Sequence, residues 1–250
     1  MQKTYVMKLY ELMKKDSNVI SCLSDSGTDY DEMIAREIPN QSLNFGISEN
    51  NKVAAAAGLA TCGKIPFVYT TNAFLAYRSY EFIRNDVCLQ NKNVKLIGMG
   101  CGLSWSTLGS THHTTEDISA LKAIPNITLL SPASPKELEV CMDYAYENEG
   151  PVYIRIGMGH EDEIYEDVSN INILKPQKIG NIKDANTSLF VTGSIISETL
   201  EAVNKLNEEG YKINVYNIAC LKPLAEKDIK KICTNTNNII VVEEHNIIGG

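Results

Sequence analysis

Residues 42–57 read SLNFGISENNKVAAAA: an extended stretch, a turn and an alanine-rich run. The pattern predicts a β-strand over 42–47 followed by a helix. Ser48 is expected to cap that helix with its side chain, which would place Glu49 in the first turn, where the helix dipole favours a negative charge. A carboxylate therefore marks the joint between a strand and a helix.

Strands and helices alternate in the same way over most of the chain. Further strands are predicted at 19–23, 66–71, 94–99, 127–131 and 152–156. Helical spacing of apolar residues lies between them, as in Leu138-Met142-Tyr146. Some strands, such as 127–130, are apolar on both faces, which is typical of a parallel sheet covered by helices. The predicted fold class is α/β, with mostly parallel, doubly wound sheets.

Two such domains are expected. Residues 1–160 form the first, 161–185 are a polar interdomain crossover, and 186–250 begin a second α/β domain. In the second domain, strands at 189–192, 213–218 and 239–243 alternate with helices at 197–209 and 225–233. The second domain is expected to be incomplete, because a helix ordinarily follows the last strand of such a unit.

The composition excludes several classes of protein. A 44% apolar and 22% charged chain is typical of a soluble globule, and no window resembles a membrane span. The net charge of −8 argues against nucleic acid as a partner. The chain has no export leader, so the cytoplasm is the expected location. The seven cysteines are scattered without a CxxC pair, which favours reduced thiols over bridges or zinc.

Candidate site residues follow the predicted strands. Ligands of parallel sheets bind beyond the carboxyl ends of the strands, where Glu49 is expected. After 66–71, the residues Phe74, Tyr77 and Tyr80 repeat at i, i+3 and i+6 on one face of a predicted helix. His112 and His113 lie in a Gly/Ser loop, and no third ligand suggests a metal site there.

The sequence also resembles a known family. The blocks GISENN (46–51), TTNAFLAYRSYEFIRNDV (70–87), GSTHHTTEDISALKAIPNITLLSPAS (109–134) and GPVYIRIG (150–157) resemble the pyrimidine-binding domain of transketolases in order and separation. VTGS (191–194), CLKPL (220–224) and VVEEHNIIGG (241–250) are similar to the start of the transketolase C-terminal domain. The resemblance covers nearly the whole chain.

The resemblance implies a thiamine diphosphate enzyme that transfers a two-carbon ketol unit between sugars. Glu49 corresponds to the family's glutamate that bonds the pyrimidine ring nitrogen of the cofactor, and this is acid–base work. Phe74 and Tyr77 match aromatic positions that stack against that ring, and Tyr80 is the third residue of the same face.

The resemblance assigns roles to three further residues. Asp25 matches an aspartate near the cofactor at the end of the first strand. His112 matches a histidine that faces the substrate and handles its hydroxyls. His113 stands where many relatives have glutamine, and we expect it to contact the substrate too.

Three positions depart from the pattern of sugar-phosphate transketolases. Leu108 replaces an acidic residue, Gly100 replaces a histidine, and Met158 replaces a phosphate-binding arginine. Arg155 lies nearby, but its place in a strand suggests another direction. Since a bidentate arginine is the usual phosphate clamp, the departures predict a substrate that is unphosphorylated, differently anchored or carried on a nucleotide.

No GDG motif for magnesium and the diphosphate occurs in the chain. The resemblance therefore implies a split enzyme, in which this chain is the C-terminal subunit. An N-terminal partner with the GDG motif would hold most of the magnesium and diphosphate contacts. The assembly is expected to be a homodimer or a heterotetramer.

Two alternatives stay open at this stage. The β subunit of a two-oxoacid dehydrogenase, or a relative of deoxyxylulose phosphate synthase, shares the pyrimidine-binding domain. A non-catalytic assembly protein is the other, although a scaffold has no need of a carboxyl group buried at a ligand mouth.

Overall fold

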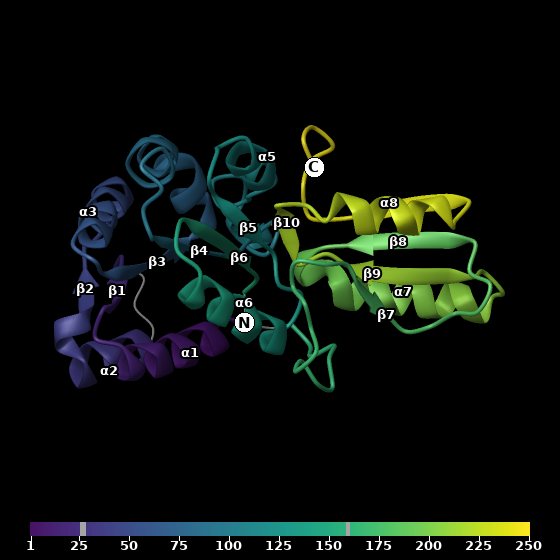
Figure 1. The fold of residues 1–250 in the computed structure, drawn as a ribbon, viewed down its shortest axis with the longest axis horizontal. Coiled ribbons are helices and arrows are strands. Elements are labelled where there is room, and N and C mark those ends of the chain that lie inside the picture. The colour runs from purple at the N-terminus through teal and green to yellow at the C-terminus, as the bar shows by residue number, and fades with distance from the viewer. Residues whose placement is uncertain (26–28, 159–160) are drawn as a thin grey trace.

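The chain forms two α/β units, each built on its own sheet (Figure 1). The structure is a computed structural model and describes residues 1–25, 29–158 and 161–250. The predicted α/β class with mostly parallel sheets is confirmed.

The first sheet has the strand order β10-β5-β6-β4-β3-β1-β2. Its strands are β1 (Val19–Leu23), β2 (Ser42–Asn44), β3 (Ile65–Thr71), β4 (Lys95–Met99), β5 (Thr128–Leu130), β6 (Val152–Ile156) and β10 (Cys220–Lys222). All neighbours pair in parallel except β10 and β5. The carboxyl ends of β1 to β6 therefore lie along one edge, where the loops with the candidate residues begin.

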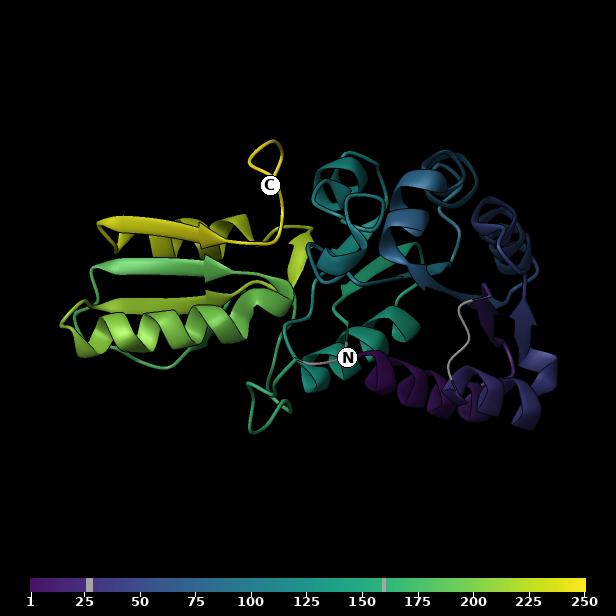
Figure 2. The same ribbon diagram turned by 180° about the vertical axis from the view of Figure 1, so that it is seen from behind.

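Helices cover both faces of this sheet, as Figures 1 and 2 show from opposite sides. One face carries α1 (Gln2–Lys15), α2 (Asp29–Glu37) and α6 (Pro135–Glu147), and the other carries α3 (Glu49–Thr61), α4 (Tyr80–Phe82) and α5 (Asp117–Lys122). Side chains of β3 alternate between them: Phe67 packs in the core under α1, and Val68 packs in the core under α3. Burial on both faces explains why the central strands are mostly apolar.

The segment after β3 differs from the α-helix that its aromatic spacing predicts. Phe74–Arg78 and Ile83–Cys88 are π-helical, with only the short α4 between them. A π-helical turn bonds residue i to i+5, so residues three apart no longer share one face as they do in an α-helix. Such turns are frequent at functional sites.

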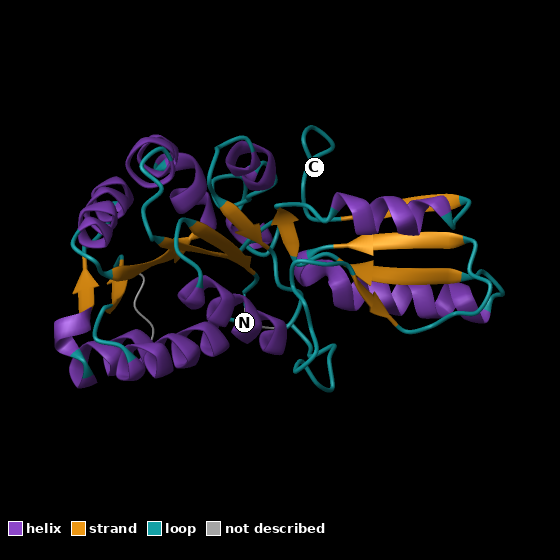
Figure 3. Ribbon diagram, viewed as in Figure 1, coloured by secondary structure: helices purple, strands orange, loops and turns teal. Residues whose placement is uncertain are grey.

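The second sheet has the order β11-β8-β9-β7 and stands beside the first (Figure 3). Its strands are β7 (Gln177–Ile179), β8 (Thr187–Val191), β9 (Ile213–Asn217) and β11 (Asn238–Val242), and only β7 runs antiparallel to its neighbour. Two helices, α7 (Ile196–Glu208) and α8 (Glu226–Thr234), flank it. Leu189, Val203 and Val215 lie in its core.

The two units are tied together at two places. After β9 the chain adds β10 to the edge of the first sheet, with Cys220 opposite Leu130. Residues 243–250 fold back onto α5, where the backbone N–H of Asn246 donates to the Thr115 carbonyl at 2.9 Å. The end of the second unit therefore reaches the helix that follows the histidine loop.

Several predicted boundaries are wrong. The strand predicted over 42–47 ends at Asn44. β7 and β10 lie outside the predicted strands, and β7 falls inside the predicted crossover. None of the helices in the described ranges is long and apolar enough to cross a membrane.

Candidate functional site

Glu49 is the first residue of α3 and is buried, with 3% of its surface exposed. Gly46 turns the chain with φ of +62°, a conformation that glycine adopts without strain. Ser48 occupies the cap position, but its hydroxyl donates to the Phe45 carbonyl at 2.6 Å. The expected side-chain cap is therefore wrong, and the turn is closed on the strand side.

The Glu49 carboxylate meets a side chain from the segment after β3. Arg78 Nη1 donates to Glu49 Oε2 at 2.7 Å. The same guanidinium lies over the ring of Phe74, with Cζ 4.4 Å from the ring centroid. Arg78 thus links Glu49 and Phe74, the two residues predicted to contact a ligand. The sequence predicted no role for Arg78 itself.

His112 also contacts Phe74. Its ring meets the Phe74 ring edge-on, with 5.1 Å between centroids, and the Trp105 ring at 6.3 Å. Its Nδ1 is 2.9 Å from the Thr111 hydroxyl. Within the described residues its Nε2 has no hydrogen-bond partner, so that atom is left for a ligand.

Lys52 is fully buried one turn after Glu49 and is a residue that the sequence reasoning missed. Its Nζ donates to Ser24 Oγ at 2.5 Å and to the Tyr69 carbonyl at 2.8 Å. Burial lowers the pKa of Lys52 to about 8, while the Glu49 carboxylate opposes that change. The signal in the sequence was its i+3 spacing from Glu49, which puts both on one face of α3.

Tyr77 and Tyr80 do not join Phe74 at Glu49. The Tyr77 hydroxyl donates to Glu116 Oε2 at 2.8 Å and accepts from the Glu116 backbone N–H at 3.1 Å. The Tyr80 hydroxyl donates to the Ala120 carbonyl at 3.2 Å. Both hydroxyls thus bond to residues at or beside α5, and Tyr77 lies in a π-helical turn where the spacing predicted an α-helix.

Asp25 and His113 lie at the margins of the cluster. Asp25 is exposed and directly follows Ser24, the residue that accepts a bond from Lys52. The His113 ring is half-buried, and its Nε2 is 3.4 Å from the Ser106 carbonyl. Neither side chain touches Glu49 or Phe74 through a contact seen in the described residues.

A buried polar network supports the carboxyl edge of the first sheet. Asn72 Nδ2, the Tyr153 hydroxyl and Arg155 Nε all donate to Asp117 Oδ2, at 2.8, 2.7 and 2.9 Å. The Tyr153 hydroxyl also lies 2.5 Å from Asn72 Oδ1. Arg155 therefore points into the fold, as its place in a strand suggested, and is committed to Asp117.

Glu244, just after β11, joins this edge to the second unit. Its carbonyl lies 3.5 Å from Arg155 Nη2, and its carboxylate accepts from the Leu103 backbone N–H at 3.1 Å and from the Ser194 hydroxyl at 2.9 Å. The loop after β4 is thus held by both units.

The loop after β4 explains one departure found in the sequence. Gly100 has φ of +77°, and a Cβ there would lie 1.8 Å from Trp105 Nε1. The Trp105 indole fills the place of a side chain at residue 100. Its Nε1 is buried and, in the described part of the chain, has no hydrogen-bond partner. Leu108 is exposed and Met158 half-buried, and both side chains are uncharged.

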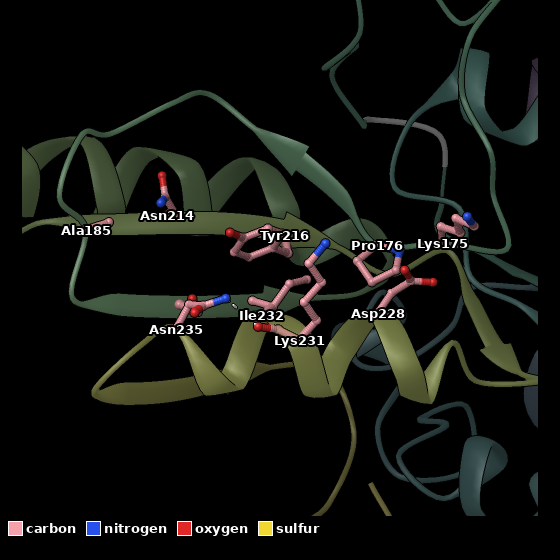
Figure 4. Close-up of a pocket in the computed structure, with 10 residues that line it drawn as sticks. Lys175, Pro176, Ala185, Asn214, Tyr216, Asp228, Lys231, Ile232 and Asn235 are labelled. Carbon is pink, nitrogen blue, oxygen red and sulfur yellow. Dashed lines mark hydrogen bonds between the residues drawn. The ribbon is translucent and has the colours of Figure 1, made fainter.

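Three hollows lie away from Glu49. One of 420 Å³ lies in the second unit between α8 and the sheet and is lined by residues such as Tyr216, Asp228 and Lys231 (Figure 4). An apolar one of 570 Å³ lies between α5 and the second unit, and one of 260 Å³ borders Met158 and Glu244. Among the described residues, no group of three His, Cys, Asp or Glu is arranged for a metal ion.

The chemistry of the cluster follows from these contacts. A buried carboxylate beside a half-buried aromatic ring suits a planar nitrogen heterocycle, which stacks on the ring and hydrogen bonds to the carboxylate. His112 stands across the same ring and leaves one nitrogen for a second, polar molecule. The cluster thus suits proton transfer between two bound molecules.

Two family descriptions match the chain. Residues 1–159 match the transketolase pyrimidine-binding domain, and residues 182–250 match the transketolase C-terminal domain. Together these matches cover nearly all of the sequence.

Several similar proteins are named as transketolase subunits. The chain is 36% identical over 220 residues to an apulose-4-phosphate transketolase subunit of Actinobacillus succinogenes, covering 86% of the chain and 68% of the relative. It is 33% identical to a putative transketolase C-terminal section of Methanocaldococcus jannaschii, covering 100% of the chain and 78% of the relative. A solved structure of a split gene transketolase, in an inactive beta4 tetramer, has a TM-score of 0.89 at 30% identity, covering 100% of the chain and 81% of that protein.

Proposed function

This chain belongs to the transketolase family, as a C-terminal subunit of a split, thiamine-diphosphate-dependent transketolase-type enzyme, and we propose that Glu49, Phe74 and His112 are its share of the active site. The observation that supports this proposal is that Glu49 is buried close to the Phe74 ring, since the Arg78 guanidinium contacts both side chains. A carboxylate at a helix start with no ligand to serve would ordinarily face solvent.

The residues present suit the pyrimidine half of the cofactor. Phe74 offers the ring on which the pyrimidine would stack, and Glu49 would accept a hydrogen bond at the pyrimidine ring nitrogen and hold the proton there. Tyr77 lies at the edge of this subsite, and Asp25 follows the strand beside it. When bound, thiamine diphosphate supplies the carbon that adds to a ketose carbonyl.

His112 is proposed to bind the sugar. Its Nδ1 faces the Thr111 hydroxyl, which leaves Nε2 to donate to or accept from a sugar hydroxyl. His113 would lie farther out, since its ring faces the Ser106 carbonyl. The relative from Actinobacillus succinogenes is named for a phosphorylated sugar, which supports a sugar substrate for this chain as well.

Whether that sugar is phosphorylated depends on the residues around His112. Gly100 and Met158 offer no cation, and Arg155 is committed to Asp117. We propose that Arg155 does not clamp a phosphate, so that a phosphate would have to be held by other residues.

We propose that a partner subunit with a GDG motif holds magnesium and the diphosphate, because the chain has no such motif. Sites at subunit contacts would then require an assembly, either a homodimer of this chain or a heterotetramer with its partner. A cytoplasmic location is also proposed, and the free state of all seven cysteines fits a reducing compartment.

The function is tested on the complex with the partner subunit. Ketose donors with an aldose acceptor, and pyruvate in parallel, are offered with thiamine diphosphate and magnesium. Transfer of a two-carbon unit without carbon dioxide release is expected. Release of carbon dioxide from pyruvate would favour the dehydrogenase or synthase alternative, and no turnover with either class would favour an assembly protein.

A further inference from the structure

Arg78 makes two contacts at once in the cluster around Glu49. Its Nη1 donates to Glu49 Oε2 at 2.7 Å, and its planar guanidinium lies over the Phe74 ring with Cζ 4.4 Å from the centroid. Its side chain is 47% exposed, whereas that of Glu49 is 4% exposed. The arginine therefore covers a buried carboxylate from the solvent side.

These two contacts are the ones that an aminopyrimidine would need. A guanidinium and an aminopyrimidine are both flat, both carry N–H donors, and both stack on an aromatic face. An aminopyrimidine stacked on the face of Phe74 that Arg78 covers, and bonded to Glu49, would meet the guanidinium where it now lies. Resting on the proposed function, we propose that Arg78 occupies the pyrimidine subsite of the free chain, must leave it before the cofactor binds, and so lowers the affinity of the chain for the cofactor.

The surroundings allow Arg78 to leave. The side chain is half exposed at the end of a π-helical turn, so it can rotate into water without unfolding the segment. Glu49 is not left alone when this happens, because the buried Lys52 lies one turn along the same face of α3. Arg78, the exposed positive charge, thus leaves, while the buried positive charge of Lys52 stays near Glu49.

The test measures the binding of 4-amino-5-hydroxymethyl-2-methylpyrimidine to the 250-residue chain by NMR titration at millimolar probe concentration. Arg78→Ala should bind this probe roughly fivefold more tightly than the unchanged chain, because an ion pair and a cation–π contact no longer compete. Arg78→Lys should fall between the two, since lysine keeps the charge but lacks the flat fork. Arg84→Ala is the matched control, because Arg84 is exposed on the same segment and donates to Asn85 instead.

Two further measurements distinguish failure of the Arg78 proposal from failure of the proposed function. Glu49→Gln should weaken probe binding both in the otherwise unchanged chain and in combination with Arg78→Ala if the carboxylate is the acceptor. Equal affinity of Arg78→Ala and the unchanged chain, with Glu49→Gln still weaker, would overturn the role of Arg78 and leave the proposed function standing. Absence of binding in every variant, with folding verified by circular dichroism, would overturn the pyrimidine subsite itself and the inference with it.

Discussion

Arg155 Nε and Asp117 Oδ2 lie 2.9 Å apart in an ion pair that is closed to solvent on both sides, with 3% and 0% of the two side chains exposed. The pair links β6 to the first residue of α5, and Arg155 also reaches the Glu244 carbonyl of the second unit. The loop that contains His112 therefore ends at Asp117, a buried residue held by an ion pair.

Asp117→Ala should destabilise the chain strongly. It leaves the guanidinium of Arg155 buried without its counter-charge, and the loss of one partner of a buried pair costs about 3 kcal/mol or more in the free energy of unfolding. Urea denaturation followed by circular dichroism measures this loss. Lys230→Ala, which breaks an exposed pair with Glu226, should leave the midpoint unchanged. Equal midpoints for both variants would contradict the structural role of the network.

Gly100→Ala should disturb the loop with Trp105. The new Cβ would lie 1.8 Å from the indole Nε1, and the backbone there has φ of +77°. Gly109→Ala is the matched control, because Gly109 has φ of +79° but nothing within 4 Å of an added Cβ. The control has only the backbone cost, about 1 to 3 kcal/mol for a residue at φ of 79° and ψ of −170°, and the test variant adds the clash. Trp105 is the chain's single tryptophan, so its fluorescence should shift in Gly100→Ala and stay unchanged in Gly109→Ala.

The buried Lys52 should make stability depend on pH. Its pKa is lowered to about 8 in the folded chain by burial, so between about pH 8 and 10.5 the unfolded chain binds more protons than the folded one. The unfolding free energy contributed by this group therefore rises with pH across that window and is constant below it.

The comparison with Lys52→Met isolates this effect. Lys95 also has a pKa lowered by burial, to about 7, and its contribution is present in both proteins. The unfolding free energy of the unchanged chain minus that of the variant should rise by an amount on the order of 3 kcal/mol between about pH 8 and 10.5. A difference that stays constant over this window would show that the pKa of Lys52 is not lowered by folding.

His112→Asn should lower kcat/KM for ketol transfer by about 100-fold in the complex with the partner subunit, as expected for the loss of a group that handles protons. His113→Gln should have a much smaller effect, because its ring faces the Ser106 carbonyl and not Phe74. Steady-state kinetics of the two variants measures the contrast. Equal losses of kcat/KM in both variants would contradict a larger role for His112 than for His113.

Much of the fold was predictable because burial on both faces leaves a strong pattern. Apart from Lys95 and Arg155, the strands β1, β3, β4 and β6 consist mostly of apolar or small residues, and their predicted positions agree closely with the structure. β10 was not predictable, since three residues of the second unit pair with β5, which lies far earlier in the sequence. Such a pairing depends on how the two units meet and leaves no local pattern.

The site was predictable in part. Glu49, Phe74 and His112 follow strand ends, and the topology brings them together. The spacing of Phe74, Tyr77 and Tyr80 predicted one continuous α-helix, whereas Phe74–Arg78 is π-helical and Tyr80 begins the short α4. Lys52 was overlooked because a lysine in an alanine-rich helix ordinarily faces water. The Tyr69 carbonyl, the Ser24 hydroxyl and the Glu49 carboxylate offset the cost of its burial.

The central claim is that the carboxylate of Glu49 takes part in catalysis. The most direct measurement is the rate of ketol transfer by Glu49→Gln, which keeps the shape of the side chain and removes its acid–base capacity, in the complex with the diphosphate-binding partner. A rate at least about 100-fold lower is expected, with complex size and thermal midpoint unchanged. A rate equal to that of the unchanged complex would contradict it.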